Sequence, residues 1–336
     1  MTKVLSRLFD SIWYRGHPLQ WLLWPFGLLY RAAVLMRRSL YRHGVLQSVE
    51  LERPVIVVGN VTVGGTGKTP CVVWLAERLR ERGYRPGIVC RGYGGSAVQW
   101  PQPVKPDDDA TVVGDESVLL ARRTGCPVVA GPDRVAAVRL LLNRHAVDVV
   151  VSDDGLQHYR LARAVEIAVV DGVRGLGNGF CLPAGPLREP AERLREVDAI
   201  IVNGGEWGHA GVFRAETVAT EVRQTTTGIT KSVEDFKGRH VHAVAGIGHP
   251  GRFFEMLEEH GMVVEPHPLP DHAAMSAADL QFTEPGMVMI TEKDEVKCRG
   301  FAHDDVWCVV ASMRMAAPDT ERLLRLLARQ LEPAAA

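Results

Sequence analysis

Short runs of β-branched and other apolar residues alternate with stretches of helical periodicity through the middle of the chain. This alternation is typical of a parallel sheet covered by helices. We expect strands at residues 55–58, 87–90, 127–130, 147–151, 167–170 and 199–202. We expect helices at residues 70–82, 116–123, 134–143 and 192–195. The pattern therefore predicts an α/β fold for this part of the chain.

A glycine-rich, polar stretch at 204–211 interrupts the alternation, and a threonine-rich segment at 212–232 has the weak period of extended strands. A second α/β run begins at His240. It continues through an expected helix at 251–260, strands at 288–290 and 306–310, and a terminal helix at 318–331. We therefore expect an N-terminal segment (1–48), a larger core (49–211), an extended linker (212–232) and a smaller α/β domain (233–332).

The N-terminal segment contains an apolar stretch at 19–36 that is rich in Trp and Tyr. A membrane-spanning helix needs about 20 apolar residues without charge, whereas Arg31 interrupts this stretch and Pro25 and Gly27 lie within it. Residues 1–43 carry seven basic residues and one acidic residue, a net charge of +6. We expect a peripheral or monotopic helix in an anionic membrane interface. A helix packed on the protein core and a true span are the alternatives.

The composition limits the class of protein but does not indicate a function. The 336 residues are 46% hydrophobic and 24% charged, as is ordinary for a globular protein of two domains. The net charge of −1 gives no indication of a nucleic-acid partner, and nothing in the sequence implies an obligate protein partner. Six cysteines are scattered without a C-x-x-C spacing, as expected for small core residues in a reducing compartment. No convincing signal peptide precedes the apolar stretch.

The strand expected at 55–58 leads into a glycine-rich loop that ends in Gly-Lys-Thr at a helix start. The loop residues are Thr62, Val63, Gly64, Gly65, Thr66, Gly67, Lys68 and Thr69. In such a loop, backbone N–H groups wrap a β-phosphate, Lys68 reaches the β/γ oxygens, and Thr69 ligates Mg²⁺. Thr62 replaces the usual first glycine. An ordinary turn is the alternative, but Pro70 and the helical period up to Gly83 favour a nucleoside triphosphate site.

Two adjacent carboxylates, Asp153 and Asp154, follow the strand expected at 147–151. Carboxylates at the end of a buried strand in a P-loop protein commonly hold Mg²⁺. Asp-Asp-Gly is also a good turn sequence, and the pattern leaves open which aspartate would contact the metal. Gln157 and His158 follow directly and are candidate substrate contacts.

Three further clusters lie at expected loop or helix ends. Arg91 follows the strand at 87–90, on the phosphate side of the sheet. Asp115 precedes an expected helix, where it could be no more than an N-cap. Arg188 and Glu189 are the charges of a stiff, proline-rich loop at 182–190 and are further candidate substrate contacts. Taken singly, each cluster has a structural turn or cap as its alternative.

Together these segments resemble the tetraacyldisaccharide 4′-kinase family, the lipid A 4′-kinases of Gram-negative bacteria. The resemblance rests on residues 60–70, 91–94, 114–116, 153–158 and 182–189, which read NVTVGGTGKTP, RGYG, GDE, DDGLQH and LPAGPLRE. It covers most of the chain, more loosely in the last third. It implies a P-loop NTPase-like fold of two α/β domains and transfer of the ATP γ-phosphoryl group to the 4′-hydroxyl of a lipid A disaccharide precursor. It also implies a peripheral enzyme on the cytoplasmic face of the inner membrane.

The resemblance also implies catalytic roles. Asp115 would be the general base, with His272 of the second domain as its partner, while Lys68 and Mg²⁺ neutralise the phosphates. Arg91 is a candidate additional clamp. The alternatives are a soluble P-loop kinase or ATPase and, from another class, a guanine-nucleotide switch. A switch needs N/T-K-x-D, but residues 291–294 place Lys and Asp next to each other.

Overall fold

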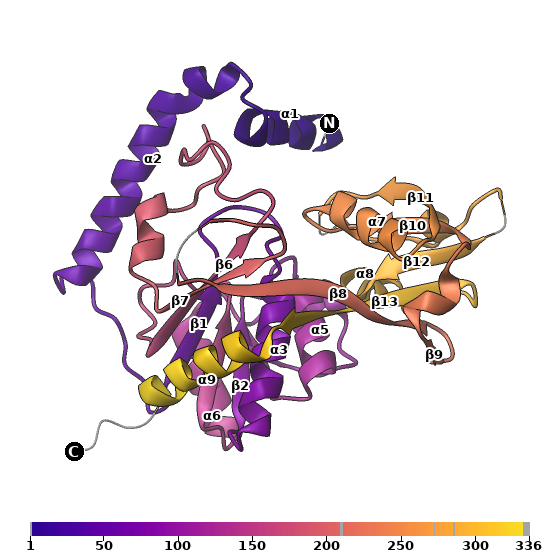
Figure 1. Ribbon diagram of the computed structural model, residues 1–336. Helices are drawn as coiled ribbons and strands as arrows, with labels where there is room; N and C mark the ends of the chain where they lie inside the picture. Colours follow the sequence, from indigo (N-terminus) through magenta and orange to yellow (C-terminus); the bar gives the residue numbers. More distant parts are fainter. Residues whose placement is uncertain (1, 209–210, 272, 285, 332–336) are drawn as a thin grey trace.

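The computed structural model describes residues 2–208, 211–271, 273–284 and 286–331. Within these residues a single mixed sheet of 13 strands runs through the whole molecule (Figure 1). Its order is β11-β10-β12-β13-β8-β7-β6-β1-β5-β2-β4-β3, with β9 paired to β8. We refer to residues 49–211, with the C-terminal residues 317–331 that pack on them, as the first lobe, and to residues 233–305 as the second lobe.

The first lobe contains the six strands expected from the sequence, each within two residues of the expected bounds. They are β1 (Val55–Gly59), β2 (Pro86–Cys90), β4 (Val128–Ala130), β5 (Val149–Asp153), β6 (Val165–Asp171) and β7 (Ala199–Asn203). All six pair in parallel, and the short β3 (Gln102–Val104) adds antiparallel to β4. Because parallel strands end at one edge, the loops after β1, β2 and β5 meet there.

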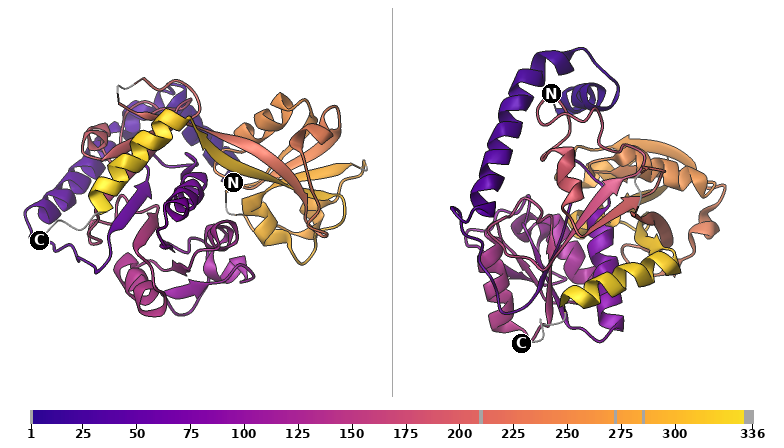
Figure 2. Two further views of the ribbon diagram at one scale, coloured as in Figure 1. Left: turned by 60° about the horizontal axis from the view of Figure 1, so that its bottom comes forward. Right: turned by 60° about the vertical axis from the view of Figure 1, so that its left-hand side comes forward.

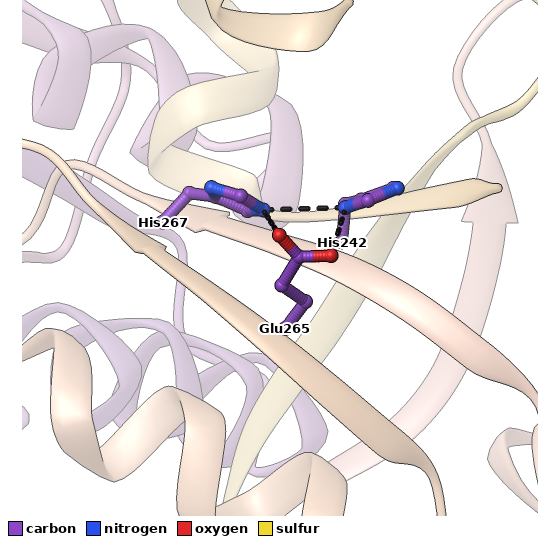
Figure 3. Close-up of side chains that lie close together, drawn as sticks. All are labelled: His242, Glu265 and His267. Carbon is purple, nitrogen blue, oxygen red and sulfur yellow. Dashed lines mark hydrogen bonds and ion pairs between the residues drawn. The ribbon is translucent and has the colours of Figure 1, made fainter. Parts of the chain in front are cut away.

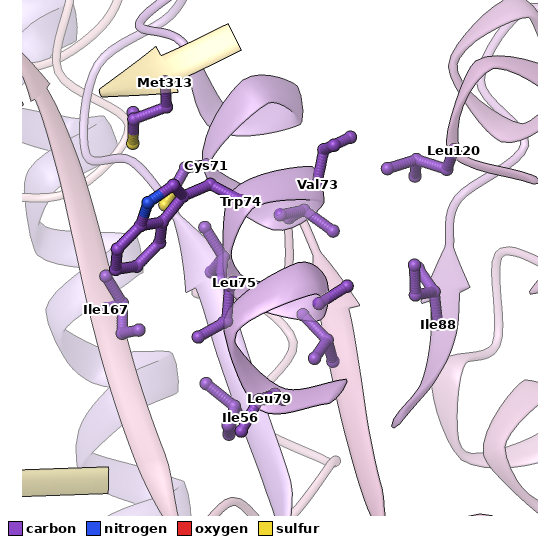
Figure 4. Close-up of a cluster of buried hydrophobic side chains, with 14 of the residues drawn as sticks. Ile56, Cys71, Val73, Trp74, Leu75, Leu79, Ile88, Leu120, Ile167 and Met313 are labelled. Atoms are coloured by element: carbon purple, nitrogen blue, oxygen red, sulfur yellow. The ribbon is translucent and has the colours of Figure 1, made fainter. Parts of the chain in front are cut away.

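Helices cover both faces of these strands. They are α3 (Lys68–Glu81), α4 (Ala110–Val113), α5 (Asp115–Thr124), α6 (Arg134–Arg144) and α9 (Ala317–Leu331). Figure 4 shows Leu75 and Leu79 of α3 packed with Ile56 in the main core, where all three are almost fully buried. The helix expected at 192–195 is a 3₁₀ helix, η1 (Ala191–Arg195). Its hydrogen bonds span three residues, as from Arg193 N to the Pro190 carbonyl (3.0 Å).

The threonine-rich segment is a long strand. β8 (Phe213–Gln224) pairs in parallel with β7 and antiparallel with β13 (Val306–Met315), with an irregularity between Val310 and Ala311. β9 (Thr230–Lys231) and η2 (Val233–Phe236) follow. The two lobes are therefore joined by a two-stranded part of one continuous sheet (Figure 1). The division into domains stays an interpretation of this arrangement.

The second lobe carries β10 (His240–Ala245), β11 (Val263–Pro268) and β12 (Met287–Thr291), with α7 (Pro250–Glu259), η3 (Ala277–Leu280) and α8 (Glu292–Cys298). Phe253 and Leu257 of α7 pack with Val241 and Ala243 in a separate small core. The sequence pattern did not indicate β11, since this mostly exposed edge strand contains Pro266 and Pro268. It did not indicate α8 either, which has seven residues and little apolar periodicity.

The N-terminal segment forms α1 (Thr2–Tyr14) and α2 (Leu19–Arg42), which extend beside the first lobe (Figure 2). Among the described residues, α2 is the one helix long and apolar enough to cross a membrane, judged by length and composition. More than half of each of five large apolar side chains is exposed: Trp21, Leu22, Phe26, Leu29 and Met36. The helix therefore does not bury its apolar residues in the protein core, as one alternative supposed. It contacts the lobe at Gly27, where a Cβ would lie 3.0 Å from the Cys181 carbonyl oxygen.

Candidate active site

The glycine-rich loop at 60–67 connects β1 to α3, as the sequence predicts, and Lys68 is the first residue of that helix. The Lys68 ammonium donates to Asn60 Oδ1 (3.2 Å) and lies 3.6 Å from Asp154 Oδ1. One neutral acceptor and one carboxylate thus hold the cation at the edge of the sheet. A third position around Nζ is left for a phosphate oxygen, because an ammonium has three donors.

Asn203, at the end of β7 two strands away from β1, holds the last turn of this loop. Gly67 has φ of +90°, and a Cβ at this position would collide with the side chain of Asn203. Asn203 Nδ2 donates to the Thr66 carbonyl (3.1 Å), and Asn203 Oδ1 accepts from the Thr217 hydroxyl (3.0 Å). The amide therefore fixes the loop backbone and requires glycine at position 67.

Asp154 is at the centre of a charged group at the end of β5. The Arg188 guanidinium donates to both of its carboxylate oxygens, each at 3.0 Å, and Lys68 approaches from the other side. Burial opposes ionisation, but the two cations outweigh it and hold the pKa of Asp154 well below its usual range. Asp154 is thus an anion at neutral pH.

Asp153 lies in a different environment although it is the next residue. Burial, with the negative charges of Glu116 and Asp154, raises the pKa of Asp153 to about 7. Its Oδ1 is buried and has no hydrogen-bond partner among the described residues. Asp153, Asp154 and Thr69 line one cavity, and carboxylate and hydroxyl oxygens are donors that Mg²⁺ prefers. The residues present therefore fit the metal predicted from the sequence.

The proline-rich loop at 182–190 supports the glycine-rich loop through main-chain contacts. Val63 N donates to the Pro186 carbonyl (2.8 Å), Arg188 N donates to the Val61 carbonyl (2.7 Å), and Thr62 forms a bridge with Leu187. Thr62 and Val63, expected to bind nucleotide, thus make backbone contacts to this loop. The other six expected residues, 64–69, line the cavity described below.

Three of the four candidate substrate contacts lie outside the cavity. Gln157 Nε2 donates to Glu189 Oε1 (2.7 Å) and to the Asn60 carbonyl (3.1 Å), and Tyr159 donates to the other oxygen of Glu189, which is 1% exposed. Burial, with nearby arginines, lowers the pKa of His158 to about 4. Gln157, His158 and Glu189 do not line the cavity, whereas Arg188 does.

A cavity of about 890 Å³ lies between the two lobes. The loop after β10 closes over the glycine-rich loop, so that a Cβ at Gly248 would lie 3.0 Å from Gly65 N. Arg252 of α7 reaches Asp171 at the end of β6 (3.7 Å). Arg91 also lines the cavity, exposed and with its guanidinium over the Tyr93 ring.

The far wall of the cavity carries charges from both lobes. Lys293 at the start of α8 contacts Glu116 (3.2 Å) and Asp271 (3.3 Å). Burial favours the neutral amine, but Glu116, Asp115 and Asp271 outweigh it and raise the pKa of Lys293 above its usual range. The predicted base, Asp115, is 5% exposed. Its Oδ1 accepts from Glu116 N (2.8 Å), and its Oδ2 lies 3.5 Å from Lys297.

The N-cap of α5 is Gly114, and Asp115 is the first helical residue. The N-cap alternative for Asp115 is therefore shifted by one position, although its carboxylate still binds an N–H group of the first turn. His272, the predicted partner of Asp115, lies outside the described residues.

Comparison with known proteins identifies the family. A family model described as tetraacyldisaccharide-1-P 4′-kinase matches residues 19–332. This chain belongs to that family. The tetraacyldisaccharide 4′-kinase of Nitrosococcus oceani is 49% identical over 322 residues, covering 96% of this chain and 95% of the relative. That of Alkalilimnicola ehrlichii is 51% identical over 316 residues, with 94% of each chain covered.

A solved structure of this kinase family has the same fold. The "apo" form of LpxK from Aquifex aeolicus in complex with ATP is 29% identical and superposes with a TM-score of 0.78. The match covers 93% of this chain and 99% of that chain. The resemblance inferred from the motifs is thus confirmed, as is the α/β fold class.

The alternative of a guanine-nucleotide switch does not fit the kinase family or residues 291–294. Asp294, which a switch would use to read the base, is fully buried at the N-terminus of α8. Its carboxylate accepts from Gly246 N (3.0 Å) and from the Thr291 hydroxyl (2.7 Å). It therefore holds the loop after β10 in place.

Sequence reasoning missed several residues of this kinase site. Lys293, Glu116, Asn203 and Arg252 line the cavity, yet none was a candidate. Glu116 fell inside segment 114–116, which carried the family resemblance, and Lys293 fell inside segment 291–294, which was considered as a guanine-recognition motif. Asn203 and Arg252 gave no local signal, since their role depends on contacts between distant segments.

We predict that Lys68→Met lowers the rate of ATP-dependent phosphoryl transfer on the order of 10²- to 10³-fold, because a charge aimed at the phosphates is lost. The fold should be unchanged, since the Lys68 side chain contacts polar groups rather than core. Turnover and circular dichroism check this, with Lys105→Met at an exposed position as the control. Wild-type turnover in correctly folded Lys68→Met would remove the assignment of the glycine-rich loop.

Proposed function

We propose that this chain transfers the γ-phosphoryl group of ATP, with Mg²⁺, to the 4′-hydroxyl of a tetraacylated glucosamine disaccharide 1-phosphate. The observation that carries the proposal is the convergence of Lys68, Thr69, Asp153 and Asp154 on one wall of the cavity between the lobes. Membership of the kinase family gives the acceptor. We take residues 49–211 and 233–332 as the two domains that enclose the site, joined through 212–232.

The phosphate end of the reaction depends on positioning and charge neutralisation. Lys68 would hold β- and γ-phosphate oxygens, and Arg91 at the end of β2 would add a second clamp from the same edge of the sheet. Thr69, Asp153 and Asp154 would hold Mg²⁺, which neutralises phosphate charge when bound. Of the predicted substrate contacts, Arg188 is supported by its place on the cavity wall; Gln157, His158 and Glu189 stay predictions.

The acceptor hydroxyl must lose its proton as the new bond forms. Asp115 is the candidate base, with His272 as its partner. Its environment supports the assignment, because Lys297 Nζ lies 3.5 Å from its Oδ2, its negative charge helps to raise the pKa of Lys293, and the adjacent Glu116 lines the cavity. Asp115 does not itself line the cavity; its carboxylate, next to Glu116, would accept the proton, and the histidine would orient it and carry the proton away.

The acceptor is a multiply acylated lipid and does not leave the bilayer, so its kinase must dock on a membrane. The exposed Trp21, Leu22 and Leu29 of α2, together with the basic residues of the segment, suit an anionic membrane interface. We place the protein on the cytoplasmic face of the inner membrane, where ATP is available. Tyr30 of the same helix donates to the Arg188 carbonyl (3.1 Å), so α2 lies next to the phosphate site.

The direct test is incubation of the purified protein with γ-labelled ATP, Mg²⁺ and the tetraacylated disaccharide 1-phosphate in mixed micelles. We expect label at the 4′ position, and no label in acceptor that already carries a 4′-phosphate. ATP hydrolysis that is unaffected by the acceptor, without labelled lipid, would contradict the proposal.

Asp115→Asn and His272→Ala test the proposed base and its partner. Loss of a positioned base costs on the order of 10²- to 10⁴-fold in rate, while ATP affinity should change little. The double variant should be hardly slower than the slower single variant, because paired catalytic groups are strongly non-additive. If Asp115 only stabilises α5, its loss lowers stability by about 1 kcal/mol and leaves turnover per folded molecule near wild type.

Flotation with vesicles that contain anionic lipid tests the docking of α2. The wild type should float with the vesicles, and Trp21→Ser/Leu22→Ser/Leu29→Ser should stay in the soluble fraction, because burial of apolar area drives interfacial binding. Val98→Ser/Ile229→Ser removes exposed apolar side chains elsewhere and is the matched control. Equal flotation of all three proteins would exclude α2 as the docking element.

A further inference from the structure

Two histidines and a glutamate lie together on the second lobe (Figure 3), and none of them is among the residues that line the cavity. His242 is on β10, and Glu265 and His267 are on the parallel edge strand β11. The strand register puts His242 directly beside Glu265, and His267 is two residues further along, on the same face of the sheet. The kinase mechanism uses none of the three.

The ligand atoms of this His–Glu–His cluster have the spacing of a metal site. His242 Nδ1 lies 3.1 Å from Glu265 Oε2 and 3.2 Å from His267 Nε2, and His267 Nε2 lies 3.6 Å from Glu265 Oε1. Zinc binds imidazole nitrogen and carboxylate oxygen at about 2.0–2.2 Å. In a tetrahedron of that size, adjacent ligand atoms are about 3.3–3.6 Å apart. The two distances to His242 Nδ1 fall just below this range and the third lies at its upper end, with a different Glu265 oxygen facing each histidine.

Hydrogen bonding to the main chain fixes the direction of the His242 lone pair. His242 Nε2 lies 3.1 Å from the Glu284 carbonyl oxygen, which can only accept, so Nε2 carries the proton. In the neutral ring, Nδ1 then presents a lone pair toward the Glu265 carboxylate and His267. A carbonyl that fixes the tautomer of a histidine in this way is typical of metal ligands.

The surroundings hold both rings in place. Phe282 stacks on His242 with a centroid distance of 4.1 Å and an interplanar angle of 11°, and it lies 4.3 Å from the His267 ring. Gly286 leaves room for His242, since a Cβ there would lie 3.1 Å from its Cδ2.

We propose that His242, Glu265 and His267 bind one Zn²⁺, with solvent completing the coordination on the exposed side of Glu265. The ion would tie the proline-containing edge strand β11 to β10. β11 ends at Pro268, three residues before Asp271, which contacts Lys293 in the kinase site. The metal would therefore stabilise the strand that leads to Asp271. This structural role is distinct from the role of Mg²⁺ in phosphoryl transfer.

The competing explanation is that a proton, instead of a metal ion, links these side chains. A doubly protonated His242 would donate to the Glu284 carbonyl and to Glu265, which requires no ion. The two explanations differ in a simple way, because only the first predicts stoichiometric zinc binding that depends on all three side chains.

The test uses the full-length protein without a histidine tag, stripped of metal with a chelator and then titrated with ZnSO₄ by calorimetry. We expect one zinc ion per chain, a higher melting temperature with zinc, and a visible ligand-field absorption band when Co²⁺ replaces zinc. Glu265→Gln and His267→Gln should each weaken zinc binding at least tenfold and lose the Co²⁺ band. Both positions are partly exposed, so these variants should fold as the wild type does by circular dichroism.

His260→Gln is the matched control. His260 pairs with Glu234 in the same lobe (3.0 Å) but has no third ligand beside it among the described residues, so its loss should leave zinc binding unchanged. Absence of stoichiometric binding to the wild type would overturn the proposal in favour of the proton. Equal binding to the wild type, Glu265→Gln and His267→Gln would also overturn it, because the ion would then lie elsewhere.

Discussion

The repulsion between two adjacent carboxylates at the end of β5 is the constraint around which the site is organised. Lys68 and Arg188 neutralise Asp154, whereas Asp153 keeps an unpartnered buried oxygen and a raised pKa. Such an arrangement is costly unless a cation or a proton is supplied. Binding of a magnesium nucleotide supplies the cation, so the free energy of ligand binding offsets a strain that the folded protein already contains.

The rest of the structure holds these charged side chains in place. Asn203 fixes the glycine-rich loop from β7, and the loop at 182–190 holds it from the opposite side through main-chain hydrogen bonds. The same proline-rich loop meets α2 through Tyr30, and Lys293 connects Glu116 of the first lobe with Asp271 of the second. The proposed membrane helix, the phosphate site and the second lobe thus contact one another through a few named side chains.

The sequence predicted those parts of the fold and site in which local pattern and chemistry coincide. The buried parallel strands, α3 and the Asp153-Asp154 pair each have a signal within ten residues. The edge strand β11 was missed because prolines and exposure remove the usual strand pattern, and the partners of Lys293 were missed because they come from segments far apart in the chain. Gln157 and Glu189 were candidate ligands because of their polarity; the structure pairs them with each other, and their part in substrate binding stays a prediction.

Proton release on nucleotide binding tests the central claim most directly. If Mg²⁺ binds at the Asp153–Asp154 pair, the proton that Asp153 carries near its pKa of about 7 must leave when Mg·ATP binds. Calorimetric titration with Mg·ATP at pH 6.5, in buffers of different ionisation enthalpy, measures this proton. Because burial raises the pKa of Asp153, the account predicts net proton release from the wild type and clearly less from Asp153→Asn. Equal proton release from the two proteins, or none from either, would contradict it.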